Sequence, residues 1–189
     1  MIKRVVGVTV AAITAGAGLA SIGTATAHAS PGKDGKITAK PSLAVRHAPS
    51  THSKYLASIK HGETVPLNCK VTGTNVNGNT KWYLLPGDSF GGHEWIAARY
   101  VKNVGTVPGW CGTGKHYVGR ATTTVSERIG PNTADQRVGT LAKGRTVDVL
   151  CKLPAQSVKG NKMWYWTKDH KWVSARYISN VGKAPGYCV

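Results

Sequence analysis

The same sequence pattern occurs twice in this chain, and this duplication constrains the fold more than any other feature. Aligning Arg46–Pro49 with Arg128–Pro131 sets an offset of 82 residues, which also superimposes the valine and cysteine positions that follow. Beyond Trp82–Tyr83 and its counterpart Trp164–Tyr165, the offset falls to 77 and keeps that value to the last cysteine. Matches in the same order over a whole unit indicate two copies of one small fold.

The change of offset marks a loop of different length in the two copies. Twelve residues separate Trp82 from Trp95, whereas seven separate Trp164 from Trp172. The longer loop, residues 86–93, is rich in Gly, Pro and polar residues. Because loops absorb insertions more readily than strands do, we expect the flanking strands to pair as a hairpin.

Each copy contains two cysteines, one near its middle and one at its end. An even number of cysteines in an exported protein indicates disulfides. The duplication favours Cys69 with Cys111 and Cys151 with Cys188, and each bridge closes a loop of about 40 residues, worth about 4 kcal/mol. A pairing between copies, such as Cys69 with Cys188, is the alternative, and it ties together two otherwise independent units.

Short strands separated by Gly and Pro are the secondary structure that the sequence predicts. Val65–Cys69 and Val147–Cys151 each place two apolar residues and then the cysteine on one face, which is the period of a half-buried strand. Met163–Trp166 and Lys171–Val173 are predicted to be hairpin strands. We therefore expect an all-β fold.

Residues 1–29 have the pattern of a secretory signal peptide. Lys3 and Arg4 precede an apolar run rich in Ala and Gly, and Ala27-His28-Ala29 forms an A-x-A cleavage site. A transmembrane helix is the alternative, but Gly and polar residues interrupt the run before it reaches the ~20 apolar residues needed to span a membrane. We expect a secreted protein, extracellular or associated with the cell wall, without a transmembrane segment.

The rest of the chain is predicted to consist of a tail, two modules and a linker. Residues 30–36 are expected to form a mobile tail, residues 37–111 the first module and residues 117–189 the second. The Gly-containing segment 112–116 is expected to be a short flexible linker.

The chain is strongly basic, with 25 Lys and Arg against 8 Asp and Glu and a net charge of +17. Removal of residues 1–29 leaves 23 basic and 8 acidic residues, a net charge of +15. Such a protein is drawn to nucleic acid, anionic lipid or an acidic cell envelope. Charge alone does not choose among them, and a solvated basic surface without a ligand is the alternative.

The opening of the first copy contains two characteristic segments, Leu43–Thr51 and His61–Val65. They resemble the opening LNVRSGPST and the KGT-V turn and strand of the bacterial SH3-type domain family. Val125–Pro131 in the second copy departs from the pattern because it lacks the Asn-Val pair. The two cysteines per copy are also not part of the usual family pattern.

The ends of the two copies carry the resemblance further. Trp82–Tyr83, Trp95–Ile96 and Ala98–Val101 are similar to the WYKV and GWVSSRYL segments of the family, and Lys171–Ile178 matches the second segment best. The resemblance implies two tandem small SH3-like β-barrels of about five strands, each here with one internal disulfide. It also implies binding to bacterial cell wall, often to a peptidoglycan peptide or cross-bridge, on behalf of a catalytic partner domain. We expect no such partner domain in this chain.

No catalytic or metal site is expected. His93-Glu94 begins like the zinc motif H-E-x-x-H, but Ala97 occupies the position of the second His. Gly109–Lys115 fits the phosphate-loop pattern, but His116 replaces the Ser or Thr that should follow and no helix begins there. The cysteines are assigned to disulfides, and no pair of acidic residues stands out, so neither a thiolate nucleophile nor paired carboxylates are predicted. We expect neither enzyme activity nor a cofactor.

Tryptophan and tyrosine are the predicted ligand-contacting residues, since six Trp and seven Tyr accompany a single Phe. These side chains are common at recognition surfaces. Neighbouring residues of a strand point to opposite faces, so one of Trp82 and Tyr83, and one of Trp164 and Tyr165, is expected to leave the core. The hypothesis is an aromatic groove flanked by Lys and Arg, and the alternative is that the tryptophans fill a small core. The groove is predicted to contain Trp82, Tyr83, Trp95, Arg99, Tyr100, Trp164, Trp166, Trp172, Arg176 and Tyr177.

Together these observations predict a secreted, non-catalytic and monomeric protein that binds a bacterial cell-wall polymer, either peptidoglycan or an anionic glycopolymer. The alternative is a secreted inhibitor or toxin-like protein that acts on another protein and presents the longer loop, residues 86–94. Specific binding to nucleic acid is not expected in an exported protein, and adhesion through charge alone would fall steeply with salt.

Overall fold

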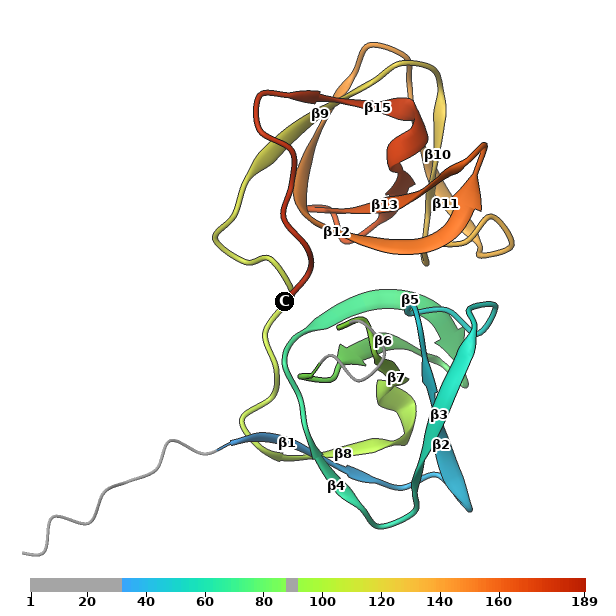
Figure 1. Cartoon of the computed structure of the whole chain (residues 1–189), viewed down its shortest axis with the longest axis vertical. Coiled ribbons are helices and arrows are strands. Elements are labelled where there is room, and N and C mark those ends of the chain that lie inside the picture. The colour runs from blue at the N-terminus through green and yellow to red at the C-terminus, as the bar shows by residue number, and fades with distance from the viewer. Residues whose placement is uncertain (1–31, 88–91) are drawn as a thin grey trace, which may run out of the picture.

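The computed structural model describes residues 32–87 and 92–189, and over these ranges the chain consists of strands and two short 3-10 helices (Figure 1). The expected all-β fold is confirmed. We refer to residues 32–111 as the first half and to residues 112–189 as the second half. The predicted signal peptide, residues 1–29, lies outside the described residues, as do residues 88–91 of the longer loop.

The first half contains β1 (Lys33–Ile37), β2 (Ser42–Arg46), β3 (Tyr55–Lys60), β4 (Thr64–Pro66), β5 (Lys70–Val76), β6 (Asn79–Leu84), β7 (Trp95–Ala97), η1 (Ala98–Tyr100) and β8 (Val101–Gly105). The second half contains β9 (Tyr117–Ala121), β10 (Val125–Arg128), β11 (Arg137–Leu141), β12 (Thr146–Val158), β13 (Asn161–Thr167), β14 (Trp172–Ser174), η2 (Ala175–Tyr177) and β15 (Ile178–Val181).

The strands follow the same order in both halves. A five-stranded sheet β3-β2-β7-β6-β5 and a three-stranded sheet β4-β1-β8 form the first half, and one seven-stranded sheet β11-β10-β14-β13-β12-β9-β15 forms the second. The difference arises because the long strand β12 takes the places of both β4 and β5. Pro66 ends β4, since proline has no N–H for the ladder, whereas Asp148 at the equivalent position continues β12.

The predicted hairpins are present in both halves. Strand β6 pairs with β7 and places Leu84 opposite Trp95, and β13 pairs with β14 and places Trp166 opposite Trp172. The preceding hairpin turns at Asn77-Gly78 and Lys159-Gly160 have positive φ at both residues, which is the type I′ geometry that fits the twist of paired strands.

The prediction of a mobile tail at residues 30–36 is wrong, because residues 33–36 belong to β1. This strand lies between β4 and β8, and the carbonyl oxygen of Lys33 accepts a 2.6 Å hydrogen bond from the N–H of Leu67. Its sequence, KDGKI, contains residues that are poor strand formers, so the sequence carried no strand signal. Gly35 is required by close packing, since a Cβ there would lie 2.4 Å from Cγ1 of Val101.

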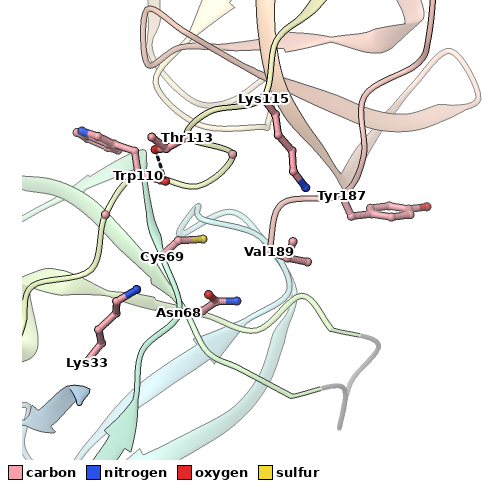
Figure 2. A pocket seen from close by; sticks show the side chains of 10 residues that line it. Lys33, Asn68, Cys69, Trp110, Thr113, Lys115, Tyr187 and Val189 are labelled. Carbon is pink, nitrogen blue, oxygen red and sulfur yellow. Dashed lines mark hydrogen bonds between the residues drawn. The ribbon is translucent and has the colours of Figure 1, made fainter. Parts of the chain in front are cut away.

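The prediction of a flexible linker at residues 112–116 is also wrong, because residues 111–114 form a hydrogen-bonded turn. The N–H of Lys115 donates to the carbonyl oxygen of Gly112 over 3.1 Å, and the Thr113 hydroxyl donates to the carbonyl oxygen of Trp110 over 2.7 Å (Figure 2). Gly112 has a positive φ, and a Cβ there would lie 2.9 Å from the carbonyl oxygen of Leu150. The turn, which joins the two halves, is therefore packed against Leu150 of β12.

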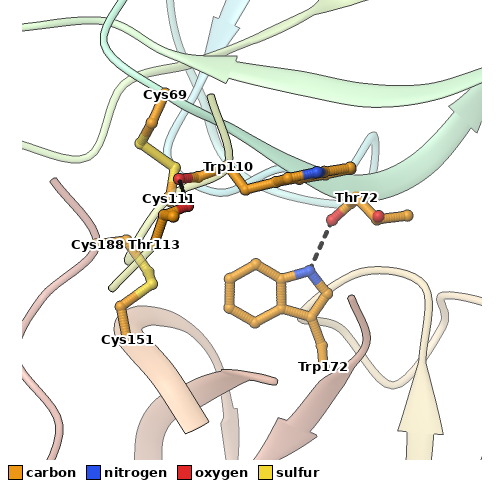
Figure 3. Close-up of a disulfide and its surroundings, with 8 residues drawn as sticks. All are labelled: Cys69, Thr72, Trp110, Cys111, Thr113, Cys151, Trp172 and Cys188. Carbon is orange, nitrogen blue, oxygen red and sulfur yellow. Dashed lines mark hydrogen bonds between the residues drawn. A yellow bond between two sulfur atoms is a disulfide. The ribbon is translucent and has the colours of Figure 1, made fainter. Parts of the chain in front are cut away.

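The two predicted disulfides are confirmed. Cys69 is bonded to Cys111, and Cys151 is bonded to Cys188, with sequence separations of 42 and 37 residues (Figure 3). In each half a lysine next to the first cysteine pairs with the residue that precedes the second cysteine: Lys70 with Trp110, and Lys152 with Tyr187. Each disulfide thus fixes the end of its half against the central strands.

Three apolar cores are present, and the largest of them is shared by the two halves. One core lies inside the first half around Ile37, Leu43 and Ile96, and another lies inside the second half around Val149 and Val173. The shared core contains Ala48, Cys69, Val71, Trp82, Leu84, Trp95, Ala97, Cys111, Leu150, Cys151, Leu153, Trp164, Trp166, Trp172 and Cys188. The expectation of two independent units is therefore wrong, because most of the tryptophan of both halves is buried between them.

A polar cluster next to the shared core joins the halves a second time. The carboxylate of Asp135, in the second half, is 2% exposed. Its Oδ1 accepts hydrogen bonds from Ser50 at 2.8 Å and Thr74 at 3.0 Å, and lies 2.9 Å from Nδ1 of His52. All three partners belong to the first half. Because a buried carboxylate needs such partners, the cluster fixes how the two halves are oriented.

Candidate binding site

The tryptophans predicted to form an open groove are buried. Their side chains are between 0 and 1% exposed, and this holds for Trp82, Trp95, Trp164, Trp166 and Trp172. A ligand on the surface cannot reach Trp95, Trp166 or Trp172 without separating the two halves, whereas one edge of Trp82 and one edge of Trp164 line recesses described below. The structure thus favours the alternative interpretation, in which the tryptophans fill a core, but that core lies between the halves rather than inside each of them.

Both faces of the Trp-Tyr strands are covered, contrary to the expectation that one residue of each pair leaves the core. Trp82 points into the shared core, while its neighbour Tyr83 points into the core of the first half. Trp164 and Tyr165 are divided in the same way. Alternation along the strand is therefore as predicted, but nothing in the local sequence indicates that each half covers the outer face of the Trp-Tyr strand of the other.

The remaining predicted residues separate into two kinds. Arg99 and Arg176 are exposed, and the structure places neither of them in a pocket lining. Tyr100 and Tyr177 are half-buried at the ends of η1 and η2, where each lines a groove. These two tyrosines are the half-exposed predicted residues at an accessible recess, and the buried Trp82 and Trp164 line the same recesses.

The two halves carry matching grooves. The first groove, of about 370 Å³, is lined by Ala39, Lys40, Ser42, Leu43, Ala44, Arg46, Thr51, Val76, Trp82, Ala97 and Tyr100. The second groove, of about 410 Å³, is lined by Thr123, Thr124, Val125, Ser126, Arg128, Thr133, Val158, Lys159, Trp164, Ser174 and Tyr177. Nine lining positions correspond pairwise through the offsets of 82 and 77 residues, from Ser42 with Thr124 to Tyr100 with Tyr177.

The edge of one indole forms part of the floor of each groove. The Nε1–H of Trp82 donates to the carbonyl oxygen of Thr74 over 2.9 Å, and the Nε1–H of Trp164 donates to the carbonyl oxygen of Gln156 over 2.8 Å. These bonds satisfy the only polar atom of each ring and fix its orientation. Trp82 and Trp164 thus shape the grooves from beneath while remaining in the shared core.

An arginine forms the same contact at the side of each groove. The guanidinium of Arg46 donates to the carbonyl oxygen of Ser53 over 2.8 Å, and that of Arg128 donates to the carbonyl oxygen of Asp135 over 2.8 Å. Each bond holds the loop that follows β2 or β10 against the groove. Sequence reasoning used these arginines only to align the copies; their identity in both copies was the signal that could have identified them as groove residues.

The grooves differ in their polar groups. In the first, the Tyr100 hydroxyl accepts a 2.6 Å hydrogen bond from the Asn77 side chain, and Lys40 supplies a cation. In the second, Lys159 replaces Asn77, and Ser126 and Ser174 replace two alanines. The second groove therefore offers more hydroxyl groups to a ligand.

The lining residues define what the grooves can do chemically. They combine apolar side chains with hydroxyls and cationic groups, and no carboxylate, imidazole or thiol side chain is among them. Such a lining can bind a neutral or anionic polymer by apolar contact and hydrogen bonds. Elsewhere in the described residues, no cluster of three or more His, Cys, Asp or Glu is placed to hold a metal ion.

Comparisons with known proteins add little. No protein-family model and no curated protein matches the chain. Among solved structures, "Endolysin LysPBC5 CBD" aligns at 11% identity and a TM-score of 0.29, covering 81% of this chain and 96% of that one. NlpC2 from Trichomonas vaginalis aligns at 10% identity and a TM-score of 0.28, covering 80% of this chain and 49% of that one. Both TM-scores are too low to support an argument about fold or function.

One further property concerns membranes. In residues 32–87 and 92–189, no helix has the length and apolar character needed to cross a bilayer.

Proposed function

We propose that this protein is a secreted, non-catalytic protein that binds a bacterial cell-wall polymer through the two grooves. In this proposal each half is a bacterial SH3-type barrel, and the halves are two copies of one binding unit. The ligand that we favour is peptidoglycan, whose sugar and peptide groups suit a groove with an apolar floor and hydroxyl and cationic sides.

The observation that carries the proposal is the correspondence of the two grooves. Nine equivalent positions line both recesses, and the Trp and Arg hydrogen bonds within them are the same to within 0.1 Å. Buried residues can repeat because each half must fold. The half-exposed Tyr100 and Tyr177 pack partly against the cores of their halves, but the rest of each side chain lines a recess at an equivalent position.

The shared core gives the grooves a fixed relation to each other. Because the halves pack through five buried tryptophans and the Asp135 cluster, a polymer with repeated units can occupy both grooves without ordering a linker. Two sites held in this way bind a polymer more tightly than either site alone.

Export is supported by the disulfides. Both bridges lie in the shared core, and disulfides of this kind persist in oxidising compartments outside the cytoplasm. The net charge of +17 favours residence at an acidic cell envelope.

The experiment is co-sedimentation with purified peptidoglycan from which anionic polymers have been removed, at high salt. The chain from Ser30 onward is compared with the double variant Tyr100→Ala/Tyr177→Ala and with the control Tyr55→Ala, which truncates a tyrosine that is 54% exposed and lies outside both grooves. We expect retention of the parent and of the control, and loss of retention in the double variant. Equal retention of all three proteins would exclude the grooves, and no retention of the parent would exclude peptidoglycan as the ligand.

A further inference from the structure

A third pocket, separate from both grooves, lies where the two halves meet the end of the chain. Its volume is about 340 Å³. It is formed by Lys33 in β1, Asn68 before the first cysteine, the segment 109–115 and the C-terminal residues Tyr187 and Val189 (Figure 2). We call it the junction pocket. None of its residues lines either groove.

Two lysines direct their ammonium groups into the junction pocket. Figure 2 shows Lys33 and Lys115 extending toward its middle from two sides, while the rings of Trp110 and Tyr187 point outward. Lys33 lies at the start of the first half and Lys115 near the start of the second, so the two lysines are far apart in sequence. Their approach is thus a result of the fold, since β1 and the turn at residues 111–114 are both held by backbone hydrogen bonds.

Three more lysines surround the two aromatic rings at the rim. The Nζ atoms of Lys70 and Lys81 lie 5.4 Å and 4.7 Å from the ring centroid of Trp110. Lys152 lies 5.1 Å from the ring centroid of Tyr187. Cation–π contacts of this length hold an ammonium group in place without neutralising its charge.

None of these five cations forms an ion pair within the described part of the chain. The ion pairs found there within 4.0 Å are His52–Asp135 and Lys171–Glu127, and the main-chain carboxylate of Val189, which belongs to the lining, is not paired with any of these lysines at that distance. One member of the set is affected by a neighbour: burial, and then the nearby Lys70, lower the pKa of Lys81. Clustered like charges cost stability, so an arrangement of this kind favours a bound anion.

We propose that the junction pocket binds phosphate groups of a polyol-phosphate polymer of the cell envelope. The lining offers ammonium and amide donors and no acidic side chain, as a phosphate requires. The Trp110 ring already stacks on His170 at 3.9 Å and carries two lysines, so little of its face is free for a nucleobase. A chain of phosphates without bases fits this surface better than nucleic acid does.

The inference adds a site to the proposed function and relies on it only for the location of the protein. The grooves would hold peptidoglycan, and the junction pocket would hold the anionic polymer that accompanies it. The two sites share no residue, so each can be removed without the other.

The test is calorimetric titration of the chain from Ser30 onward with a defined poly(glycerol phosphate) chain at physiological salt. The variant Lys33→Gln/Lys115→Gln is compared with Lys36→Gln/Lys102→Gln, which removes the same charge from exposed lysines paired across β1 and β8. We expect affinity to fall about tenfold to a hundredfold in the first variant, since charged hydrogen bonds are lost, and less than about threefold in the control.

Three results would overturn the proposal. The first is no binding of the polymer by the parent protein. The second is an equal loss of affinity in both variants, which would mean that net charge alone attracts the polymer. The third is tighter binding, through the same lysines, of a single-stranded oligothymidylate with the same number of phosphates, which would assign the pocket to nucleic acid. Retention on polymer-free peptidoglycan should be unchanged in Lys33→Gln/Lys115→Gln, so failure of this inference leaves the groove proposal standing.

Discussion

The indole Nε1–H of Trp172 donates a 2.7 Å hydrogen bond to the main-chain carbonyl oxygen of Thr72, a residue 100 positions earlier in the chain (Figure 3). Trp172 belongs to the second half and Thr72 to the first, and both groups are buried. The equivalent tryptophan of the first half, Trp95, is also buried, but its Nε1–H has no hydrogen-bond partner among the residues that the structure describes. The two halves therefore use the same residue differently, and only one copy reaches across the contact.

Because of this difference, replacing tryptophan by phenylalanine should change the free energy of unfolding by different amounts at Trp172 and at Trp95. Trp172→Phe removes the bond to Thr72 and leaves a buried carbonyl oxygen with one partner fewer, whereas Trp95→Phe removes an N–H that had none. Both variants lose similar volume in the shared core. We expect Trp172→Phe to lower the free energy of unfolding by about 1–2 kcal/mol more than Trp95→Phe does, as measured by denaturant titration. An equal or smaller loss in Trp172→Phe would contradict the role given to this bond.

Asp135 gives a second test of the contact between the halves. Asp135→Ala leaves Ser50 and Thr74 without their shared acceptor, so we expect a loss of about 3 kcal/mol in the free energy of unfolding. The matched control is Asp148→Ala, which removes an exposed carboxylate from β12 and should change stability by less than about 0.5 kcal/mol. A small effect at Asp135 would mean that the polar cluster does not hold the halves together.

The disulfides, the hairpins and the all-β fold could be predicted from the sequence because each depends on local signals that occur twice. These local signals are the spacing of the cysteines, the Gly and Pro residues between strands, and the alternation of side chains around Trp82 and Trp164. Strand β1 was missed because KDGKI has neither alternation nor strand formers, and its position is decided by pairing with distant strands. Local sequence does not record such pairing.

The candidate site was predicted less well, and for a physical reason. A Trp on the outer face of a strand has the same sequence signature whether it contacts a ligand or another part of the chain. The groove hypothesis included Trp82 and Trp164, with a tryptophan-filled core inside each module as the alternative, and neither interpretation included a core shared by the two halves. Tyr100 and Tyr177 were placed near an accessible recess, whereas Arg46 and Arg128 were not considered as site residues.

Three histidines with lowered pKa values determine whether the free energy of unfolding rises or falls with pH. Burial lowers the pKa values of His47, His93 and His170 below the usual 6.5, and nearby positive charges lower them further. Between the lowered values and 6.5 the unfolded chain binds more protons than the folded chain does. The stability that these neutral histidines contribute is therefore fully present above about pH 6.5. This contribution is lost progressively as the pH falls from 6.5 through the lowered pKa values.

The measurement is the denaturant midpoint of the same protein at pH 7 and pH 5. We expect a lower midpoint at pH 5, and a smaller difference between the two pH values in His170→Gln, which removes one of the three groups. A midpoint that is unchanged or higher at pH 5 would contradict the assignment of these histidines as buried in their neutral form.

Removal of either disulfide is predicted to lower the free energy of unfolding by a similar amount. Cys69→Ala/Cys111→Ala opens a loop of 42 residues, and Cys151→Ala/Cys188→Ala opens a loop of 37 residues. Loop entropy depends only weakly on length, so each double variant should lose about 2–5 kcal/mol. Because the shared core contains all four cysteines, calorimetry of either variant should still show one transition. Separate transitions of the two halves would mean that they fold independently.

The central claim is that the two grooves, and not the buried tryptophans, contact the cell wall. Backbone amide NMR of the chain from Ser30 onward, titrated with soluble disaccharide-peptide fragments of peptidoglycan, tests this claim most directly. We predict shift changes at both grooves, around Arg46 and Tyr100 and around Arg128 and Tyr177, with the Trp172 indole signal unmoved. Shift changes confined to the indole signals of the shared core, or no changes at any fragment concentration, would contradict it.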